Sequence, residues 1–164
     1  MPKLRARRPV VGILITHHHG DHIGYAGQLA KRTNAPIFIS QIEHDIALNA
    51  LEMSDEKYGD IIASAYLNYG LPEEIIERNR EVGNYFKKLV GPLLDLQIIN
   101  AGQTIKTIAG EWTVRLDAGH SPAHLGLFDE ERKLYLAVDF LLGRISPNIS
   151  VSYTHLTLPT IRSV

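Results

Sequence analysis

One short segment constrains this chain more than any other. Residues 16–24 read Thr-His-His-His-Gly-Asp-His-Ile-Gly and directly follow the apolar run of residues 10–15. That run is short, rich in β-branched side chains and preceded by Pro9, so we predict a buried strand there and a helix over residues 22–32. The histidines therefore lie after the carboxyl end of a strand, where open α/β sheets usually place their chemistry.

The spacing of these polar residues predicts a metal site. Side chains two positions apart in an extended segment point the same way, so His17 and His19 can face one ion while His18 points elsewhere. After a turn at Gly20, the side chains of Asp21 and His22 can return to the same pocket. Imidazole nitrogens and a carboxylate oxygen suit zinc, and also iron or manganese. The alternative is an exposed polar loop, which would not explain this order of residues behind a buried strand.

The same residues carry a resemblance to a known family. The pattern Thr-His-x-His-x-Asp-His resembles the signature of the metallo-β-lactamase-fold hydrolase superfamily. Residues 118–124, Ala-Gly-His-Ser-Pro-Ala-His, resemble its Gly-His-Ser/Thr-x-Gly-His turn, and residues 136–139, Leu-Ala-Val-Asp, resemble the strand that ends in its metal-bridging aspartate. The histidine at position 18 is similar to that of the glyoxalase II (hydroxyacylglutathione hydrolase) branch. The resemblance covers about residues 10–149.

This resemblance implies six metal ligands, which would hold one or two zinc ions, with iron or manganese as alternatives. They are His17, His19, Asp21, His22, His120 and Asp139. The three residues His17, His19 and His120 would bind the first ion. The second ion would be bound by Asp21 and His22, and Asp139 would bridge the two. The family's final histidine ligand, which lies well beyond the bridging aspartate, has no counterpart in this sequence.

The implied activity is that of a metal-dependent hydrolase, glyoxalase II-like, in which a metal-bound hydroxide attacks a thioester or ester carbonyl. Asp21 would be catalytic by orienting the water, and Thr16 and His124 would hold the ligands from behind. Other branches of the superfamily stay open: a lactonase, a phosphodiesterase or nuclease, or an iron persulfide dioxygenase. A chain that binds metal without turnover, as an inactive fragment, is a further alternative.

The order of predicted elements defines the expected architecture. A strand, a helix and a second strand over residues 36–40 predict a right-handed parallel unit. We then expect helices over 42–53, 55–69 and 72–90, followed by strands over 96–100, 104–108, 112–116, 125–128 and 133–138. Together with the resemblance, this order predicts an α/β fold: a partial αββα sandwich with mixed sheets and a helical insertion at about 42–90.

Composition limits the other function classes. The chain has 164 residues, of which 45% are hydrophobic and 21% charged, with a net charge of -1, so we expect a single domain with no electrostatic preference for nucleic acid or an anionic membrane. No apolar run approaches the roughly 20 residues of a membrane span. The sequence has no cysteine, which permits a cytoplasmic location. The expected partner is a small ester or thioester, and the oligomeric state stays open.

The end of the chain does not fit this pattern. Residues 150–164 have a poor strand pattern and are similar to the translation of a sequencing-library transposon adapter. We therefore expect residues 1–149 to form one truncated domain and residues 150–164 to be a non-native tail. His155 lies in that tail and is not counted among the predicted ligands.

Overall fold

The computed structural model describes residues 9–91, 93 and 95–146, so the predicted tail lies outside the described residues. Its elements follow in chain order. They are β1 (Ile13–Leu14), α1 (Gly20–Ile23), α2 (Ala26–Thr33), β2 (Ile37–Ile39), α3 (Gln41–Glu52), α4 (Asp55–Asn68), α5 (Glu73–Val82), α6 (Tyr85–Leu89), β3 (Leu96–Ile98), β4 (Thr104–Thr107), β5 (Gly110–Asp117), β6 (His124–Asp129), β7 (Leu134–Leu136) and the 3-10 helix η1 (Val138–Phe140).

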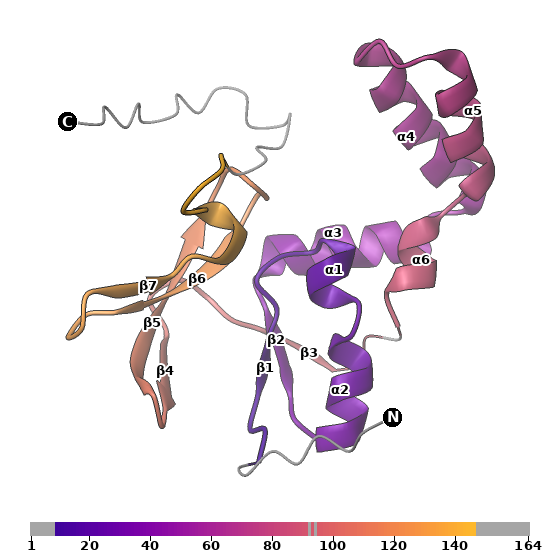
Figure 1. Cartoon of the computed structure of the whole chain (residues 1–164). Helices are drawn as coiled ribbons and strands as arrows, with labels where there is room; N and C mark the ends of the chain where they lie inside the picture. Colours follow the sequence, from indigo (N-terminus) through magenta and orange to yellow (C-terminus); the bar gives the residue numbers. More distant parts are fainter. Residues whose placement is uncertain (1–8, 92, 94, 147–164) are drawn as a thin grey trace, which may run out of the picture.

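The described strands form two sheets (Figure 1). The first has the order β1-β2-β3 and is parallel, with Ile37 opposite both Ile13 and Leu96. The second has the order β4-β5-β6-β7 and is antiparallel. The predicted combination of parallel and antiparallel strands with helices is confirmed, and in the described residues each arrangement has a sheet of its own.

Successive side chains of β1 and β2 point to opposite faces of the sheet, and this decides how the two sheets and the helices pack. Ile37 and Ile39 are buried in a core with helices α1, α2, α3 and α6. Phe38 and Leu14 point the other way and pack against Val114 and Leu125 of the second sheet. Side chains in a strand alternate between faces, so β2 contributes to both cores at once. The parallel sheet is thus the middle layer, with helices on one face and the antiparallel sheet on the other.

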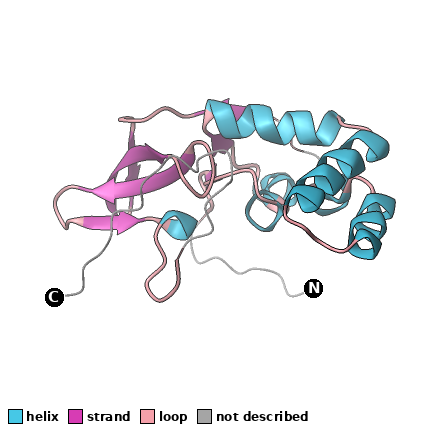
Figure 2. Ribbon diagram, turned by 90° about the horizontal axis from the view of Figure 1, so that it is seen from above, coloured by secondary structure: helices cyan, strands magenta, loops and turns pink. Residues whose placement is uncertain are grey.

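The helical insertion lies where the sequence predicted it, but the sequence did not predict every point at which one helix ends and the next begins. Helices α3 and α4 occupy the predicted ranges, and α3 runs from the sheets to the α4–α5 hairpin, which projects away from both sheets (Figure 1, Figure 2). The single helix predicted over 72–90 is wrong, because α5 ends at Val82 and α6 begins at Tyr85. Gly83 between them has φ 67° and ψ -149°, a conformation almost restricted to glycine.

A similar break divides the helix predicted over 22–32. The chain forms α1 up to Ile23 and begins α2 at Ala26. Gly24 separates them, and a β-carbon there would lie 2.4 Å from the carbonyl oxygen of Gly20 and 2.9 Å from that of Leu89. The close approach of α6 therefore requires a residue without a side chain at this position.

Two hydrogen bonds join the ends of the sheets where the polar segment lies. The backbone N–H of Leu125 donates to the carbonyl of Thr16 at 2.7 Å, and the Ser40 hydroxyl donates to the carbonyl of Ala123 at 2.9 Å. The end of β1, the start of α3 and the start of β6 are thereby held together.

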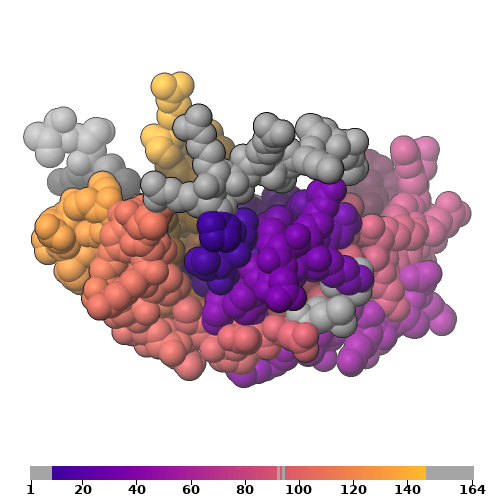
Figure 3. Space-filling view, turned by 90° about the horizontal axis from the view of Figure 1, so that it is seen from below, coloured from indigo at the N-terminus to yellow at the C-terminus, as the bar shows by residue number. Residues whose placement is uncertain are grey.

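From below, the first described residues lie directly beside the β4–β5 region (Figure 3). Within the described ranges, no helix has both the length and the apolar character needed to cross a membrane.

Candidate metal centre

Three imidazole nitrogens from two distant segments converge on one point. The Nε2 atom of His17 lies 3.0 Å from Nδ1 of His19 and 3.1 Å from Nε2 of His120. The remaining side of the triangle, from His120 Nε2 to His19 Nδ1, is 3.0 Å. His17 and His19 follow β1, and His120 lies in the turn between β5 and β6. The structure therefore brings together the three residues predicted to bind the first ion.

The chemistry of this triangle fits a cation better than a hydrogen-bond network. Each neutral imidazole nitrogen has either one proton or one lone pair, so three nitrogens facing one another cannot all be paired. A tetrahedral zinc ion with Zn–N distances of about 2.0–2.1 Å places its nitrogens about 3.3–3.4 Å apart. The observed sides of 3.0–3.1 Å are close to that spacing. A single cation would satisfy all three lone pairs.

The local environment keeps two of these rings neutral, as metal ligation requires. The side chain of His17 is completely buried. Burial, followed by the nearby imidazoles with His22 first, lowers the pKa of His17 from 6.5 to about 2. Burial and the neighbouring imidazole of His18 lower the pKa of His19 to about 4. Both rings therefore offer lone pairs at neutral pH.

Asp139 lies between this triangle and His22. Its Oδ2 atom is 3.0 Å from Nε2 of His22, 3.7 Å from Nε2 of His120 and 4.0 Å from Nε2 of His17. The sequence predicted Asp139 at the end of a strand, but β7 ends at Leu136 and Asp139 lies in η1. Nitrogens of His17 and His22 and a carboxylate oxygen of Asp139 form a second group with ligand geometry. The two groups share His17, and Asp139, a member of the second group, also lies 3.7 Å from His120 of the first, so its carboxylate reaches toward both.

Asp21 stands apart from the residues that converge. Its side chain is 79% exposed, and its Oδ2 atom lies 3.5 Å from Nε2 of His22. It belongs to neither of the two groups of converging ligand atoms. The structure thus places the predicted catalytic residue at the rim of the cluster, next to a predicted ligand.

The two residues predicted to hold the ligands from behind, Thr16 and His124, both lie next to His17. The Thr16 hydroxyl lies 3.0 Å from Nδ1 of His17, so it can fix the orientation of that ring and leave Nε2 facing the triangle. His124 is also fully buried, and its ring centre is 4.9 Å from that of His17. Neither ring nitrogen of His124 hydrogen-bonds to a described residue, so it contacts His17 by packing. Burial lowers the pKa of His124 as well.

Sequence reasoning missed one buried acid beside the cluster. Glu43, in the first turn of α3, has no exposed surface, and its carboxylate binds His18 and the backbone of Ala123. His18 belongs to neither group of converging ligand atoms, and its ring nitrogen Nδ1 lies 2.6 Å from Oε2 of Glu43. Glu43 and Ala47, four positions apart, are both buried on the inner face of α3, but this spacing alone does not identify an acid that bonds to two other segments.

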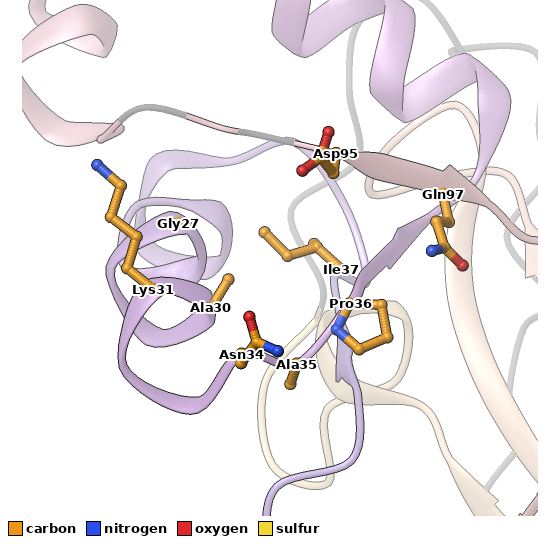
Figure 4. A pocket seen from close by; sticks show the side chains of 9 residues that line it. All are labelled: Gly27, Ala30, Lys31, Asn34, Ala35, Pro36, Ile37, Asp95 and Gln97. Atoms are coloured by element: carbon orange, nitrogen blue, oxygen red, sulfur yellow. The ribbon is translucent and has the colours of Figure 1, made fainter.

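A separate pocket lies at the other end of the parallel sheet (Figure 4). It is formed by the end of α2 and the starts of β2 and β3, has a volume of about 350 Å³ and contains Lys31 and Asp95 at its edge. None of the histidines of the cluster lines it. The cluster follows the carboxyl end of β1, whereas this pocket is at the amino end of β2, so the two are distinct.

Comparison with known proteins agrees with this geometry. Residues 2–163 match the family model described as the metallo-beta-lactamase superfamily. The fold is similar to a beta-lactamase domain protein from Burkholderia ambifaria (26% identity, TM-score 0.68) and to the metallo-beta-lactamase family protein TTHA1429 from Thermus thermophilus (28%, 0.67). Each match covers 87% of this chain, which spans only 40% and 44% of those two proteins.

A more distant likeness concerns the fold alone. TTHA1623, solved in a di-iron-bound form, is 21% identical with a TM-score of 0.52, and the match covers 88% of this chain and 56% of that one. The family model spans nearly the whole sequence. The chain therefore belongs to the metallo-beta-lactamase superfamily.

Proposed function

We propose that this chain provides the metal centre of a metal-dependent hydrolase. The observation that carries the proposal is the triangle formed by His17, His19 and His120, whose three nitrogens lie 3.0–3.1 Å apart. Membership of a superfamily composed largely of metallo-hydrolases supports the same conclusion. Zinc is the proposed metal because imidazole and carboxylate are among its usual ligands. Iron is the alternative, since the similarly folded TTHA1623 was solved with two iron ions.

The residues of the chain would divide the work between binding and proton handling. A bound divalent cation would supply Lewis acidity, lowering the pKa of a water ligand and polarising the substrate carbonyl. His17, His19 and His120 would hold it, and Asp139 would link it to a second ion near His22. The exposed carboxylate of Asp21 could reach solvent and substrate together, so we assign to it the orientation of the attacking water.

For the substrate we propose a small thioester or ester, as in the glyoxalase II branch. Support comes from the histidine at position 18 and from the segment of residues 118–124 that carries His120. Glu43 lies 2.6 Å from the His18 ring, which gives that histidine a fixed place beside the site. The net charge of -1 supports a small molecule rather than nucleic acid as the partner. We also propose a cytoplasmic location, which the cysteine-free sequence permits.

The experiment combines metal loading with a substrate panel. The metal-free 164-residue chain is loaded with zinc, manganese or ferrous iron and assayed against glutathione thioesters, simple thioesters, lactones and phosphodiesters. We expect stoichiometric metal binding and metal-dependent cleavage of thioesters above the other classes. The variant Asp21→Asn should bind metal but lose most turnover, and Asp45→Asn, an exposed carboxylate on α3, serves as the matched control. Failure of the wild-type chain to bind metal would overturn the proposal.

A second candidate function is metal binding without turnover. The chain spans 40% and 44% of two similar solved proteins. An apolar pocket of about 430 Å³ between the two sheets, lined by Val11, Phe38 and Ile105 among others, is open to solvent, so the sheets are incompletely covered there. Stoichiometric metal binding with no cleavage of any substrate class would favour this candidate.

A further inference from the structure

We infer that Glu43 is a positioning residue that fixes the two histidine-bearing loops against each other, so that His17, His19 and His120 meet. The first histidine loop is residues 16–19, and the second histidine loop is residues 118–123. This inference rests on the proposed metal centre and adds to it a residue that would touch neither metal nor substrate.

The two carboxylate oxygens of Glu43 divide their bonds between the loops. Oε2 accepts the backbone N–H of His18 at 3.0 Å and lies 2.6 Å from the Nδ1 atom of the same residue. Oε1 accepts the backbone N–H of Ala123 at 2.8 Å. His18 lies between the candidate ligands His17 and His19, and Ala123 follows His120 by three positions. One side chain thus connects segments that are 25 and 80 positions away from it in the sequence.

The side chains of Ser40 and Glu43, at the start of α3, bond to the histidine loops instead of capping their own helix. Ser40 and Glu43 have the S-x-x-E spacing of a capping box, in which each side chain would bond to the backbone of the same turn. In this structure Ser40 makes no side-chain cap, and its hydroxyl donates to the carbonyl of Ala123 at 2.9 Å. Both backbone groups of Ala123 are therefore held by α3. A local rule broken in this way is typical of a functional site.

Because Glu43 is buried and charged, it is stabilised only when both histidine loops are in place to bond to it. A buried carboxylate is costly unless it is fully hydrogen-bonded. Burial raises the pKa of Glu43, but the bonds from His18 and from the Ala123 backbone outweigh it and lower the pKa to about 2. The groups of His18 and Ala123 that hydrogen-bond this carboxylate belong to the two histidine loops. A displaced loop would leave the charge partly unpaired, so Glu43 favours the arrangement in which the histidines converge.

Replacing Glu43 by glutamine tests this inference with the smallest change in shape. Each carboxylate oxygen faces an N–H group, so the amide NH₂ of Glu43→Gln must oppose a donor in either orientation. The matched control is Glu52→Gln, which makes the same change at an exposed position of the same helix. For both variants, circular dichroism checks folding, and chelator competition measures cobalt(II) affinity.

We expect Glu43→Gln to lower cobalt affinity by about 10-fold or more and to change the visible absorption spectrum of the bound ion, because outer partners of ligands are typically worth about 10–100-fold in affinity. The control Glu52→Gln should keep both values. A folded Glu43→Gln variant with wild-type affinity and spectrum would overturn the inference. If the wild-type chain binds no cobalt, the proposed function itself fails, which is a different and recognisable result.

A second variant and a second measurement keep the inference testable should Glu43→Gln not fold. Ser40→Ala removes the other bond to Ala123 and leaves the first histidine loop untouched, so we expect a smaller loss of cobalt affinity, of about 3–10-fold. Amide exchange in the metal-free wild-type chain should show the N–H groups of His18 and Ala123 protected at least about 100-fold. Unchanged affinity in Ser40→Ala, or exchange of these two amides at unstructured rates, would overturn the inference.

Discussion

The Nε2 atom of His120 lies 3.1 Å from the Nε2 atom of His17, although 103 positions separate the two residues in the sequence. Nothing local in the chain requires this contact. It arises because the antiparallel sheet packs on the parallel sheet and because Thr16 and Leu125 hydrogen-bond across the junction. A contact between two polar rings at such a junction has a cost in burial, and a shared cation would offset it by using both lone pairs.

Removing one of the three histidines of the triangle should strongly weaken metal binding. Replacing His120 by alanine removes one of three converging nitrogens, and we expect zinc affinity to fall more than about 100-fold, beyond the effect of an outer partner. Isothermal titration calorimetry on the metal-free chain measures this change. His44→Ala is the matched control, since His44 lies on α3 outside the cluster and its ring contacts the neighbouring Asp45. Equal loss in both variants would argue against a specific role for His120.

Asp139 should decide how many ions the chain holds. Its carboxylate oxygen lies 3.0 Å from His22 and 3.7 Å from His120, so it reaches toward both proposed ion positions. The substitution Asp139→Asn removes the negative charge with little change in volume, and we expect the number of ions bound per chain to fall from two to one. Metal analysis after equilibrium dialysis gives this ratio. A ratio unchanged in the variant would show that Asp139 does not bridge.

Acid should destabilise the metal-free chain in a defined window. Burial and neighbouring imidazoles lower the pKa values of His17 to about 2 and of His19 to about 4, from 6.5 in the unfolded chain. Below about pH 6.5 the unfolded state therefore binds protons that the folded state does not bind. The free energy of unfolding falls as the pH drops. Glu43 adds a second loss only below its unfolded value of 4.5.

Urea denaturation at about pH 7 and about pH 5 separates the histidine contribution from that of Glu43. We expect the wild-type chain to lose stability between the two values, and His19→Gln to lose less, because it has one fewer histidine that titrates only when unfolded. His44→Gln provides the comparison at a histidine outside the cluster. A wild-type chain with equal stability at both pH values would contradict the assignment of neutral, buried imidazoles.

Gly83 should be the less replaceable of two glycines in the helical insertion. It has φ 67° and ψ -149°, and a β-carbon there would lie 2.9 Å from that of Asp55. We expect Gly83→Ala to cost about 1–3 kcal/mol or more in free energy of unfolding. Gly70 also has a positive φ of 72°, but nothing lies within 4 Å of the added carbon, so Gly70→Ala should cost about 1 kcal/mol. Thermal denaturation compares them, and an equal cost would show that the contact with Asp55 is unimportant.

Much of the fold was predictable because its signals are local. The apolar run before His17 and the helix after it predicted the parallel unit. The strands predicted from residue 96 onward are present, but the first of them, β3, pairs in parallel with β2 instead of joining the antiparallel sheet. The break at Gly83 and Asn84 was not predicted. Asn84 is fully buried and donates to the carbonyls of Ala50 and Met53, so the end of α5 is set by contacts with residues about thirty positions earlier.

The candidate site shows the same division. The motif pattern predicted that His17, His19, His22, His120 and Asp139 would come together, and the structure brings them together. The place of Asp21 at the rim was not predicted, because the direction of an exposed side chain after a turn depends on the surrounding loops. Glu43 was missed because its partners lie in two other segments, and no periodicity in α3 alone indicates a buried charge that joins them.

X-ray absorption spectroscopy of the zinc-loaded chain tests the central claim most directly, because it counts the imidazoles on the ion itself. The account predicts a first shell of nitrogen and oxygen at about 2.0–2.1 Å with outer-shell scattering from at least three imidazole rings. Replacing His120 by alanine should reduce that count by one. A zinc ion with one imidazole or none in the wild-type chain would contradict the claim that these distant histidines share a cation.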